Sequence, residues 1–133
     1  MSRFSRRALL FVGVAAANLF TAGPSFADSV RKFDAKFFQT AQSAGQAVLI
    51  EVHADWCPTC KAQAPVLEKL SKDKNYSQIV RYRVDFDTQK QLLKNFKVAY
   101  QSTLILFVGT KEVARSVGVT NEMAIRAMLD MAI

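Results

Sequence analysis

Two cysteines, Cys57 and Cys60, are the residues best suited to chemistry, and only two residues separate them in the chain. A cysteine thiolate attacks disulfide bonds, so a close pair of cysteines can exchange electrons with another disulfide. Two cysteines are too few for the disulfide framework of a small secreted domain. His53 is the single histidine, so cysteine and histidine cannot complete a four-ligand zinc site within one chain, although a site shared between two chains stays open. The spacing therefore indicates a redox pair, and we expect no metal and no cofactor.

The composition of the 133 residues suits one globular domain, because half are hydrophobic and glycine and proline are few. The formal net charge is +7, but residues 1–27 contain three arginines and no acidic residue. The remainder carries 15 basic residues, the 18 of the chain less those three, against 11 acidic ones, which leaves +4. An excess of this size indicates a solvated basic surface rather than a nucleic-acid or membrane partner.

Residues 1–27 have the pattern of a bacterial signal peptide. Three arginines precede the apolar run 8–20, and the small-residue site Ser25-Phe26-Ala27 predicts cleavage that leaves Asp28 at the new N-terminus. The apolar run is shorter than the ~20 residues that span a membrane, which favours cleavage over an uncleaved anchor. The pair Arg6-Arg7 also fits a twin-arginine signal, and the choice between that route and general secretion stays open. Either route predicts an exported protein, most simply in the oxidising bacterial periplasm.

Residues 28–133 contain no repeat or linker and are predicted to form one domain. Apolar spacing predicts helices over 34–43, after the cysteine turn as far as Leu70, over 88–96, and from a Thr120 cap onward. Met123, Ala127, Met128 and Met131 are the predicted apolar stripe of the last helix. β-rich or apolar runs predict strands over 47–53, 79–86, 103–108 and 112–117. This order predicts an α/β fold in three layers, with a central mixed sheet between two layers of helices.

The chain resembles the thioredoxin family from about Asp34 to Met131. The run 51–61 is similar to the end of the family's central strand, its tryptophan and its active-site turn, and Pro65 stands where the family kinks the following helix. A Cys-x-x-Cys pair after a strand and at the start of a helix is a specific signal. The resemblance implies the three-layer thioredoxin fold and a thiol–disulfide oxidoreductase that acts on disulfide-containing proteins. It implies motif and substrate-surface roles for Trp56, Pro58, Thr59, Lys61, Ser102 and Thr103.

The sequence departs from the family pattern at two positions. Ser102 stands where the family carries a cis-proline before the strand that begins at Thr103, and Glu51 replaces a buried aspartate. A cis bond before a residue other than proline costs ~3–4 kcal/mol, so we expect this loop to be trans or strained. In the family the loop faces the cysteines and pairs with extended substrates. Substrate binding is therefore the property that Ser102 changes most.

Cys57 is predicted to be the nucleophile, because a helix N-terminus stabilises a thiolate. Cys60 would stay protonated until it attacks the mixed disulfide and leaves Cys57 and Cys60 joined in a disulfide. Glu51 is a candidate acceptor for the Cys60 proton, although it could instead reach solvent, and Arg83 is positioned to pair with it. His53 is predicted to pack beside the site, and Trp56 to shield the disulfide or to fill core space.

Three functions remain open on the sequence. The first is a reductase of protein disulfides in the cell envelope, which is favoured because Thr59 stands where strong oxidants of the family have a thiolate-stabilising histidine. The second is a disulfide oxidant or isomerase, and the third is a non-catalytic carrier of metal or client proteins. We expect a monomer that receives electrons from a membrane or soluble thiol donor.

Overall fold

The computed structural model describes residues 30–133, so the predicted leader over residues 1–27 lies outside the described part. The strands are β1 (Arg31–Lys32), β2 (Ala47–His53), β3 (Val80–Asp85), β4 (Thr103–Val108) and β5 (Lys111–Val117). The helices are α1 (Ala35–Ser43), α2 (Pro58–Ser71), α3 (Lys90–Asn95) and α4 (Glu122–Leu129), followed by the 3₁₀ turn η1 (Asp130–Ala132). No helix among residues 30–133 is long and apolar enough to cross a membrane.

The strands form one mixed sheet in the order β1-β3-β2-β4-β5. β1 and β2 run parallel to β3, whereas β4 is antiparallel to β2 and to β5. β2 is central, and its five interior residues are buried: Val48, Leu49, Ile50 and Val52, as their apolar character predicts, and the charged Glu51. The two-residue strand β1 was not predicted, because so short a segment carries no recognisable alternation.

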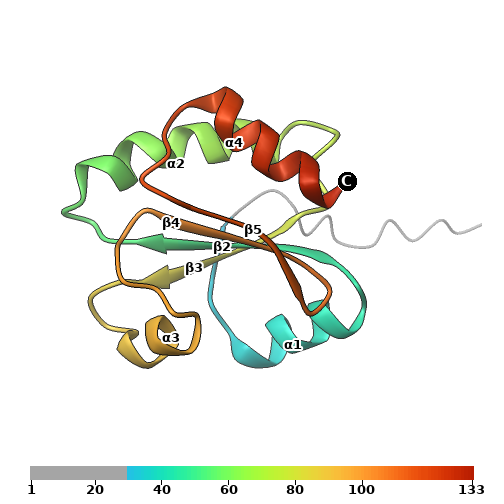
Figure 1. Cartoon of the computed structure of the whole chain (residues 1–133), viewed down its shortest axis with the longest axis horizontal. Coiled ribbons are helices and arrows are strands. Elements are labelled where there is room, and N and C mark those ends of the chain that lie inside the picture. Colours follow the sequence, from blue (N-terminus) through green and yellow to red (C-terminus); the bar gives the residue numbers. More distant parts are fainter. Residues whose placement is uncertain (1–29) are drawn as a thin grey trace, which may run out of the picture.

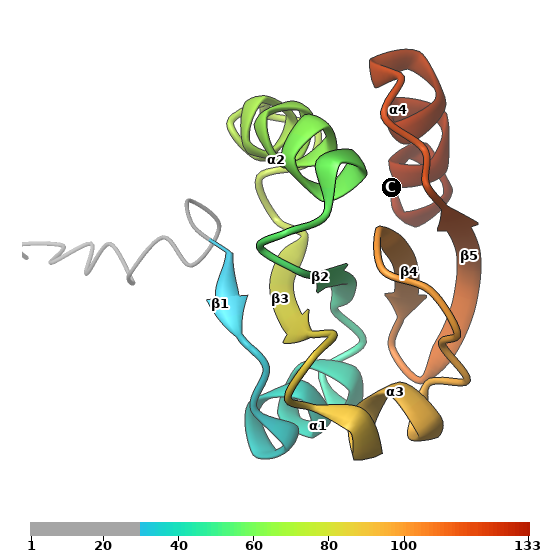
Figure 2. The same cartoon turned by 90° about the vertical axis from the view of Figure 1, so that its left-hand side faces the viewer.

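Helices cover both faces of the sheet, with α2 and α4 on one side and α1 and α3 on the other (Figure 1). The view from the side shows the sheet edge-on between the two helical layers (Figure 2). The predicted three-layer α/β fold with a mixed sheet is therefore confirmed.

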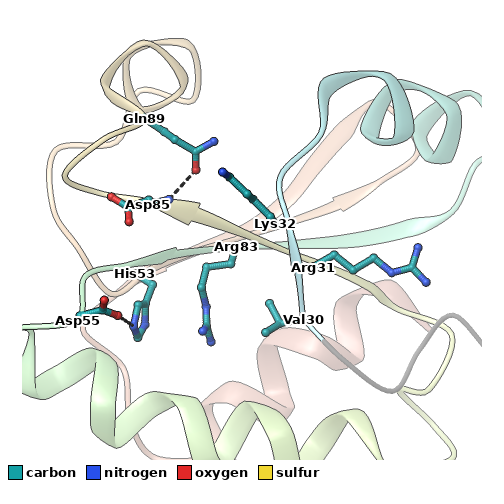
Figure 3. Close-up of a pocket in the computed structure, with 8 residues that line it drawn as sticks. All are labelled: Val30, Arg31, Lys32, His53, Asp55, Arg83, Asp85 and Gln89. Atoms are coloured by element: carbon teal, nitrogen blue, oxygen red, sulfur yellow. Dashed lines mark hydrogen bonds and ion pairs between the residues drawn. The ribbon is translucent and has the colours of Figure 1, made fainter.

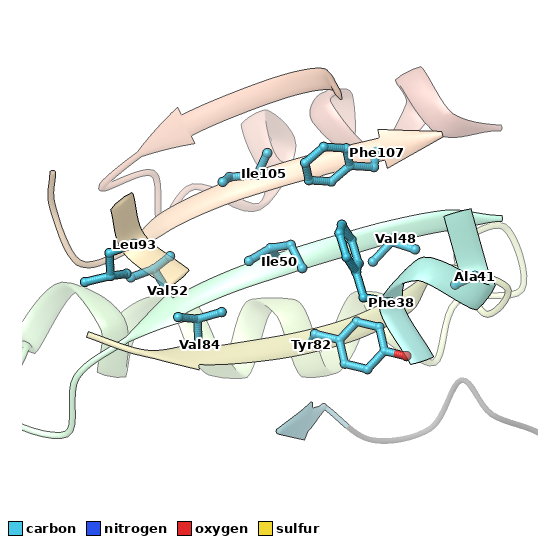
Figure 4. Packing of buried hydrophobic residues seen from close by; sticks show 10 residues of the cluster. All are labelled: Phe38, Ala41, Val48, Ile50, Val52, Tyr82, Val84, Leu93, Ile105 and Phe107. Carbon is cyan, nitrogen blue, oxygen red and sulfur yellow. The ribbon is translucent and has the colours of Figure 1, made fainter. Parts of the chain in front are cut away.

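Two hydrophobic clusters hold these layers together. On the face of α1 and α3, aromatic and aliphatic side chains pack over the three central strands, with Phe38 against Phe107 and Tyr82 (Figure 4). On the opposite face, Leu67 and Leu70 of α2 meet Ile125 of α4 above β2 and β4. Because α2 is packed along its length, its first turn is held in a fixed position beside the sheet.

The last helix differs from its prediction in two respects. Asn121, not Thr120, is the N-cap residue, and its Oδ1 accepts a 3.1 Å hydrogen bond from the backbone N–H of Ala124. The buried face consists of Ile125, Met128 and Leu129. The remaining members of the predicted stripe are exposed: Met123, Ala127 and Met131. The predicted stripe is therefore right at Met128 and wrong at its other three members, because Ile125 and Leu129 complete the face that packs on the sheet.

Candidate active site

Cys57 begins helix α2, which directly follows the central strand. It is the N-cap residue, with extended backbone angles (φ −80°, ψ 114°), and its Sγ accepts a 3.1 Å hydrogen bond from the backbone N–H of Cys60. Pro58 follows within the first helical turn, where its missing N–H would have no helical partner. The free amides and dipole of this helix end favour an anion, so the local fold favours a thiolate at Cys57.

Both cysteines are free thiols and almost fully buried, with 1% and 2% of their surface exposed at Cys57 and Cys60. Burial is the largest influence on the pKa of Cys57 and raises it, but hydrogen bonds from Cys60, Ser102 and the helix backbone together bring that pKa below its ordinary value. The pKa of Cys60 is raised, first by burial and then by its hydrogen bond to Cys57. One thiol is thus set to ionise first, while the other keeps its proton.

The Ser102 side chain contacts both sulfur atoms. Its Oγ lies 3.2 Å from Cys57 Sγ and 3.1 Å from Cys60 Sγ, and the residue is 2% exposed. No peptide bond among residues 30–133 is cis, and Ser102 instead has φ of +60°, in the left-handed region that serine rarely enters. The altered loop thus brings a hydroxyl group against the cysteine pair.

The backbone of Ser102 is hydrogen-bonded within the protein. Its N–H donates to the Val52 carbonyl over 2.9 Å, and its carbonyl accepts from Gly118 N–H (3.0 Å) and from Nε2 of the buried Gln63 (3.3 Å). The next residue, Thr103, is buried and donates through Oγ1 to the Tyr100 carbonyl over 2.6 Å. Since both polar groups of the Ser102 backbone have partners, neither is free to pair with an extended substrate.

Glu51 is buried in β2, but its carboxylate faces two arginines. Oε1 accepts a 2.6 Å hydrogen bond from Arg81 Nε, and Oε2 lies 3.5 Å from Arg83 Nη2. No hydrogen bond or ion pair among residues 30–133 joins Glu51 to Cys60. The proton-acceptor role of Glu51 therefore stays a prediction, and the expected pairing with Arg83 is present.

Arg81 is the residue of this region that sequence reasoning missed. It is 5% exposed and bridges Glu51 of the sheet to Glu68 of α2, at 2.6 Å and 3.2 Å respectively. Arg81 and Arg83 lie two residues apart on β3, so both point to the face that carries Glu51. The spacing of the two arginines could have identified Arg81 from the sequence. Residues two apart on a strand lie on the same face, and strand pairing places that face of β3 beside the face of β2 that carries Glu51.

Trp56 stands at the surface beside the cysteine turn. Its side chain is 57% exposed, its Nε1 donates to Asp87 Oδ2 over 2.9 Å, and its ring packs edge-on against Phe86. Of the remaining motif residues, Pro58 and Lys61 are exposed and Thr59 is half-buried. His53 is half-buried with Nε2 3.2 Å from Asp55 Oδ1, a partner that sequence reasoning did not identify.

A hollow of about 310 Å³ opens where β1, β2 and β3 meet (Figure 3). Its lining is mixed in charge: Arg31, Lys32, His53, Asp55, Arg83 and Asp85, together with Val30 and Gln89. The cysteines do not line this hollow. Within residues 30–133, no group of three or more His, Cys, Asp or Glu side chains is arranged to hold a metal ion.

A three-layer α/β fold with a Cys-x-x-Cys pair opening the helix after the central strand defines a thioredoxin-like protein. The thioredoxin family model matches residues 29–131. Thioredoxin from Mycobacterium tuberculosis H37Rv is 34% identical over 97 residues, which cover 73% of this chain and 83% of that protein. The structure of Trxlp from Edwardsiella tarda EIB202 is 42% identical, with a TM-score of 0.74 over 76% of this chain and 98% of that one.

A further relative is larger than this chain. The bifunctional thioredoxin reductase/thioredoxin of Mycobacterium leprae is 36% identical over 92 residues, which cover 69% of this chain but 20% of that protein. The shared part is thus about a fifth of that relative's length.

The chain belongs to the thioredoxin family. Family membership and the spacing of Cys57 and Cys60 identify it as a thiol–disulfide oxidoreductase that acts through a cysteine pair.

Proposed function

We propose that this protein reduces disulfide bonds of other proteins in the bacterial cell envelope. The observation that carries the exchange chemistry is the contrast between the two thiols: Cys57 is the N-cap of α2 and has a lowered pKa, and Cys60 lies within the first turn and has a raised one. In this proposal the Cys57 thiolate attacks the substrate disulfide, and Cys60 then displaces the reduced substrate. A membrane or soluble thiol donor restores both thiols, and the protein acts as a monomer.

The two residues between the cysteines favour the reducing direction of electron flow. Pro58 and Thr59 carry no charge, so neither provides the cationic stabilisation of a thiolate that makes a disulfide strongly oxidising. Several relatives bear the name thioredoxin, and thioredoxins act on disulfide-containing protein substrates together with a reductant. Both points favour reduction of client disulfides.

One observation favours a second candidate, a disulfide oxidant or isomerase. The Ser102 hydroxyl lies 3.2 Å from Cys57 Sγ and adds a hydrogen-bond donor for the thiolate. Stabilising the thiolate stabilises the reduced protein, and so makes the disulfide a stronger oxidant. The reduction potential separates this candidate from the reductase.

A turbidity assay of insulin reduction by dithiothreitol tests for catalysis. We expect the wild-type protein to accelerate the precipitation of insulin chains, and Cys57→Ser to abolish the acceleration. Cys60→Ser should trap a mixed disulfide on Cys57, because the resolving thiol is absent. No acceleration by the folded wild-type protein, together with stoichiometric metal after purification, would support a carrier and contradict the proposal.

The proposed location depends on residues 1–27, so it needs its own experiment. The full chain, expressed in a Gram-negative bacterium, should appear in the periplasmic fraction with Asp28 as its first residue. Repeating the expression without the twin-arginine translocase distinguishes the two export routes. Retention of the uncleaved chain in the cytoplasm would contradict an envelope location.

A further inference from the structure

The Ser102 hydroxyl occupies an unusual place between the two reacting sulfur atoms. Its Oγ is within 3.2 Å of Cys57 Sγ and 3.1 Å of Cys60 Sγ, and the site is closed to solvent. A hydroxyl both donates and accepts hydrogen bonds. When Cys57 is a thiolate it has no hydrogen to give, so Ser102 must donate to Cys57, and its lone pairs are left to accept from the Cys60 thiol.

The backbone holds this hydroxyl in position. At φ of +60° a residue other than glycine is strained. Hydrogen bonds at both the N–H and the carbonyl of Ser102, to Val52, Gly118 and Gln63, keep it there. A strained conformation held by its surroundings is a feature that concentrates at functional sites.

The other groups near Cys60 are less able to take its proton. The Val52 carbonyl lies 3.9 Å from Cys60 Sγ and has no proton to pass on. Both carboxylate oxygens of Glu51 face arginine side chains. Among residues 30–133, Ser102 bears the one hydroxyl that is hydrogen-bonded to Cys60 Sγ.

We propose that Ser102 is a third catalytic residue, which relays the proton of Cys60 to the departing substrate sulfur. This inference rests on the proposed function. Cys60 Sγ attacks Cys57 Sγ in the mixed disulfide, the Cys57–substrate bond breaks, and its electron pair goes to the substrate sulfur. Ser102 Oγ takes the Cys60 proton and gives its own proton to that sulfur. The products are the Cys57–Cys60 disulfide, a neutral serine and a substrate thiol, so the substrate is reduced by two electrons.

The relay predicts a dependence on the leaving group. An alkyl thiolate such as that of glutathione is the more basic leaving group, so a proton supplied as it departs speeds its release, whereas an aromatic thiolate such as thionitrobenzoate leaves readily without one. The reduced protein is mixed rapidly with excess glutathione disulfide or excess dithionitrobenzoate. The attack of Cys57 on the reagent becomes faster as the reagent concentration rises, whereas resolution of the mixed disulfide by Cys60 does not, so the two steps can be separated.

Ser102→Ala and Ser102→Gly are the test variants, since both lack the hydroxyl and glycine also tolerates the positive φ. We expect both to slow the release of glutathione about a hundredfold, a usual contribution of proton transfer in catalysis, and to slow thionitrobenzoate release far less. Ser77→Ala is the control, because the Ser77 hydroxyl bonds the Lys74 carbonyl in a surface loop, and it should match the wild type.

Two results would overturn the relay while leaving the proposed function intact. One is wild-type release of glutathione from both variants, and the other is an equal slowing with both leaving groups, which would indicate displaced cysteines. A wild-type protein that forms no Cys57–Cys60 disulfide with either reagent would instead overturn the proposed function, and the relay with it.

Discussion

Glu51 and Arg81 form a buried ion pair, in which Arg81 Nε donates to Glu51 Oε1 over 2.6 Å and neither side chain is more than 5% exposed. Removing one partner of such a pair leaves a buried charge without compensation. The pair ties β2 to β3 just before β2 leads into the cysteine turn. It therefore supports the active site from within the sheet.

Glu51→Gln should lower the free energy of unfolding by about 3 kcal/mol, because the Arg81 guanidinium loses its buried carboxylate partner and keeps only Glu68, whose side chain is 43% exposed. Urea titration measures this loss. A loss below about 1 kcal/mol, the value of an exposed pair, would contradict the buried-pair account. The folded fraction of the variant should release glutathione at close to the wild-type rate if Ser102 carries the proton. A large loss of that rate would favour Glu51 as proton acceptor.

The rate of alkylation by iodoacetamide should rise with pH as the Cys57 thiol ionises. Reactivity follows the thiolate, so it rises with pH and reaches half its maximum at the pKa of Cys57, which is lowered here. The midpoint should therefore fall below the ~8.5 of a free thiol, and peptide mapping should find the label on Cys57. Cys60, whose pKa is raised, should stay unlabelled until the pH is higher. Labelling of Cys60 first, or a midpoint above ~8.5, would contradict the assignment of the two thiols.

Restoring the family's proline at position 102 should destabilise this protein. Proline fixes φ near −65° and has no N–H, whereas Ser102 has φ of +60° and donates to the Val52 carbonyl. Ser102→Pro should thus cost more than about 1 kcal/mol, whereas Ser102→Gly should cost less than the proline, because glycine keeps the N–H and tolerates the positive φ, which offsets the lost hydroxyl contacts. Thermal unfolding of the two variants measures both changes. A more stable proline variant would show that the left-handed loop is not the native one.

The N-cap of α4 offers a matched pair of substitutions. Asn121→Ala should cost about 1 kcal/mol, because Ala124 N–H loses the side-chain acceptor that caps the helix. Thr120→Ala should change the stability little, since Thr120 is exposed and lies before the cap. Denaturant unfolding of the two variants compares them. Equal losses of stability in the two variants would contradict the assignment of Asn121 as the N-cap.

Much of the fold follows from local patterns in the sequence. The strands β2 and β4 have the bounds predicted from their apolar runs, because a strand that is buried on both faces consists mostly of apolar residues. The start of the last helix, α4, was harder to predict. Thr120 and Asn121 are both good caps by residue type, and the backbone geometry that makes Asn121 the cap does not follow from residue type.

The active site was predictable in its residues but not in its contacts. The spacing of Cys57 and Cys60 sufficed to locate the pair, and the absence of proline at position 102 marked an altered loop. The hydroxyl contact to both sulfurs depends on a positive φ at a serine, which propensity does not predict. Likewise, the Arg81 contact depends on the register between β2 and β3, a relation between distant segments.

The reduction potential of the Cys57–Cys60 pair tests the proposed reductase most directly. Equilibrating the protein with glutathione buffers of known ratio, and trapping the thiols at each ratio, gives the potential. We predict a value near the ~−270 mV of thioredoxin, which would drive electrons toward client disulfides. A value near the ~−120 mV of a strong oxidant would contradict this direction and make the protein a donor of disulfides.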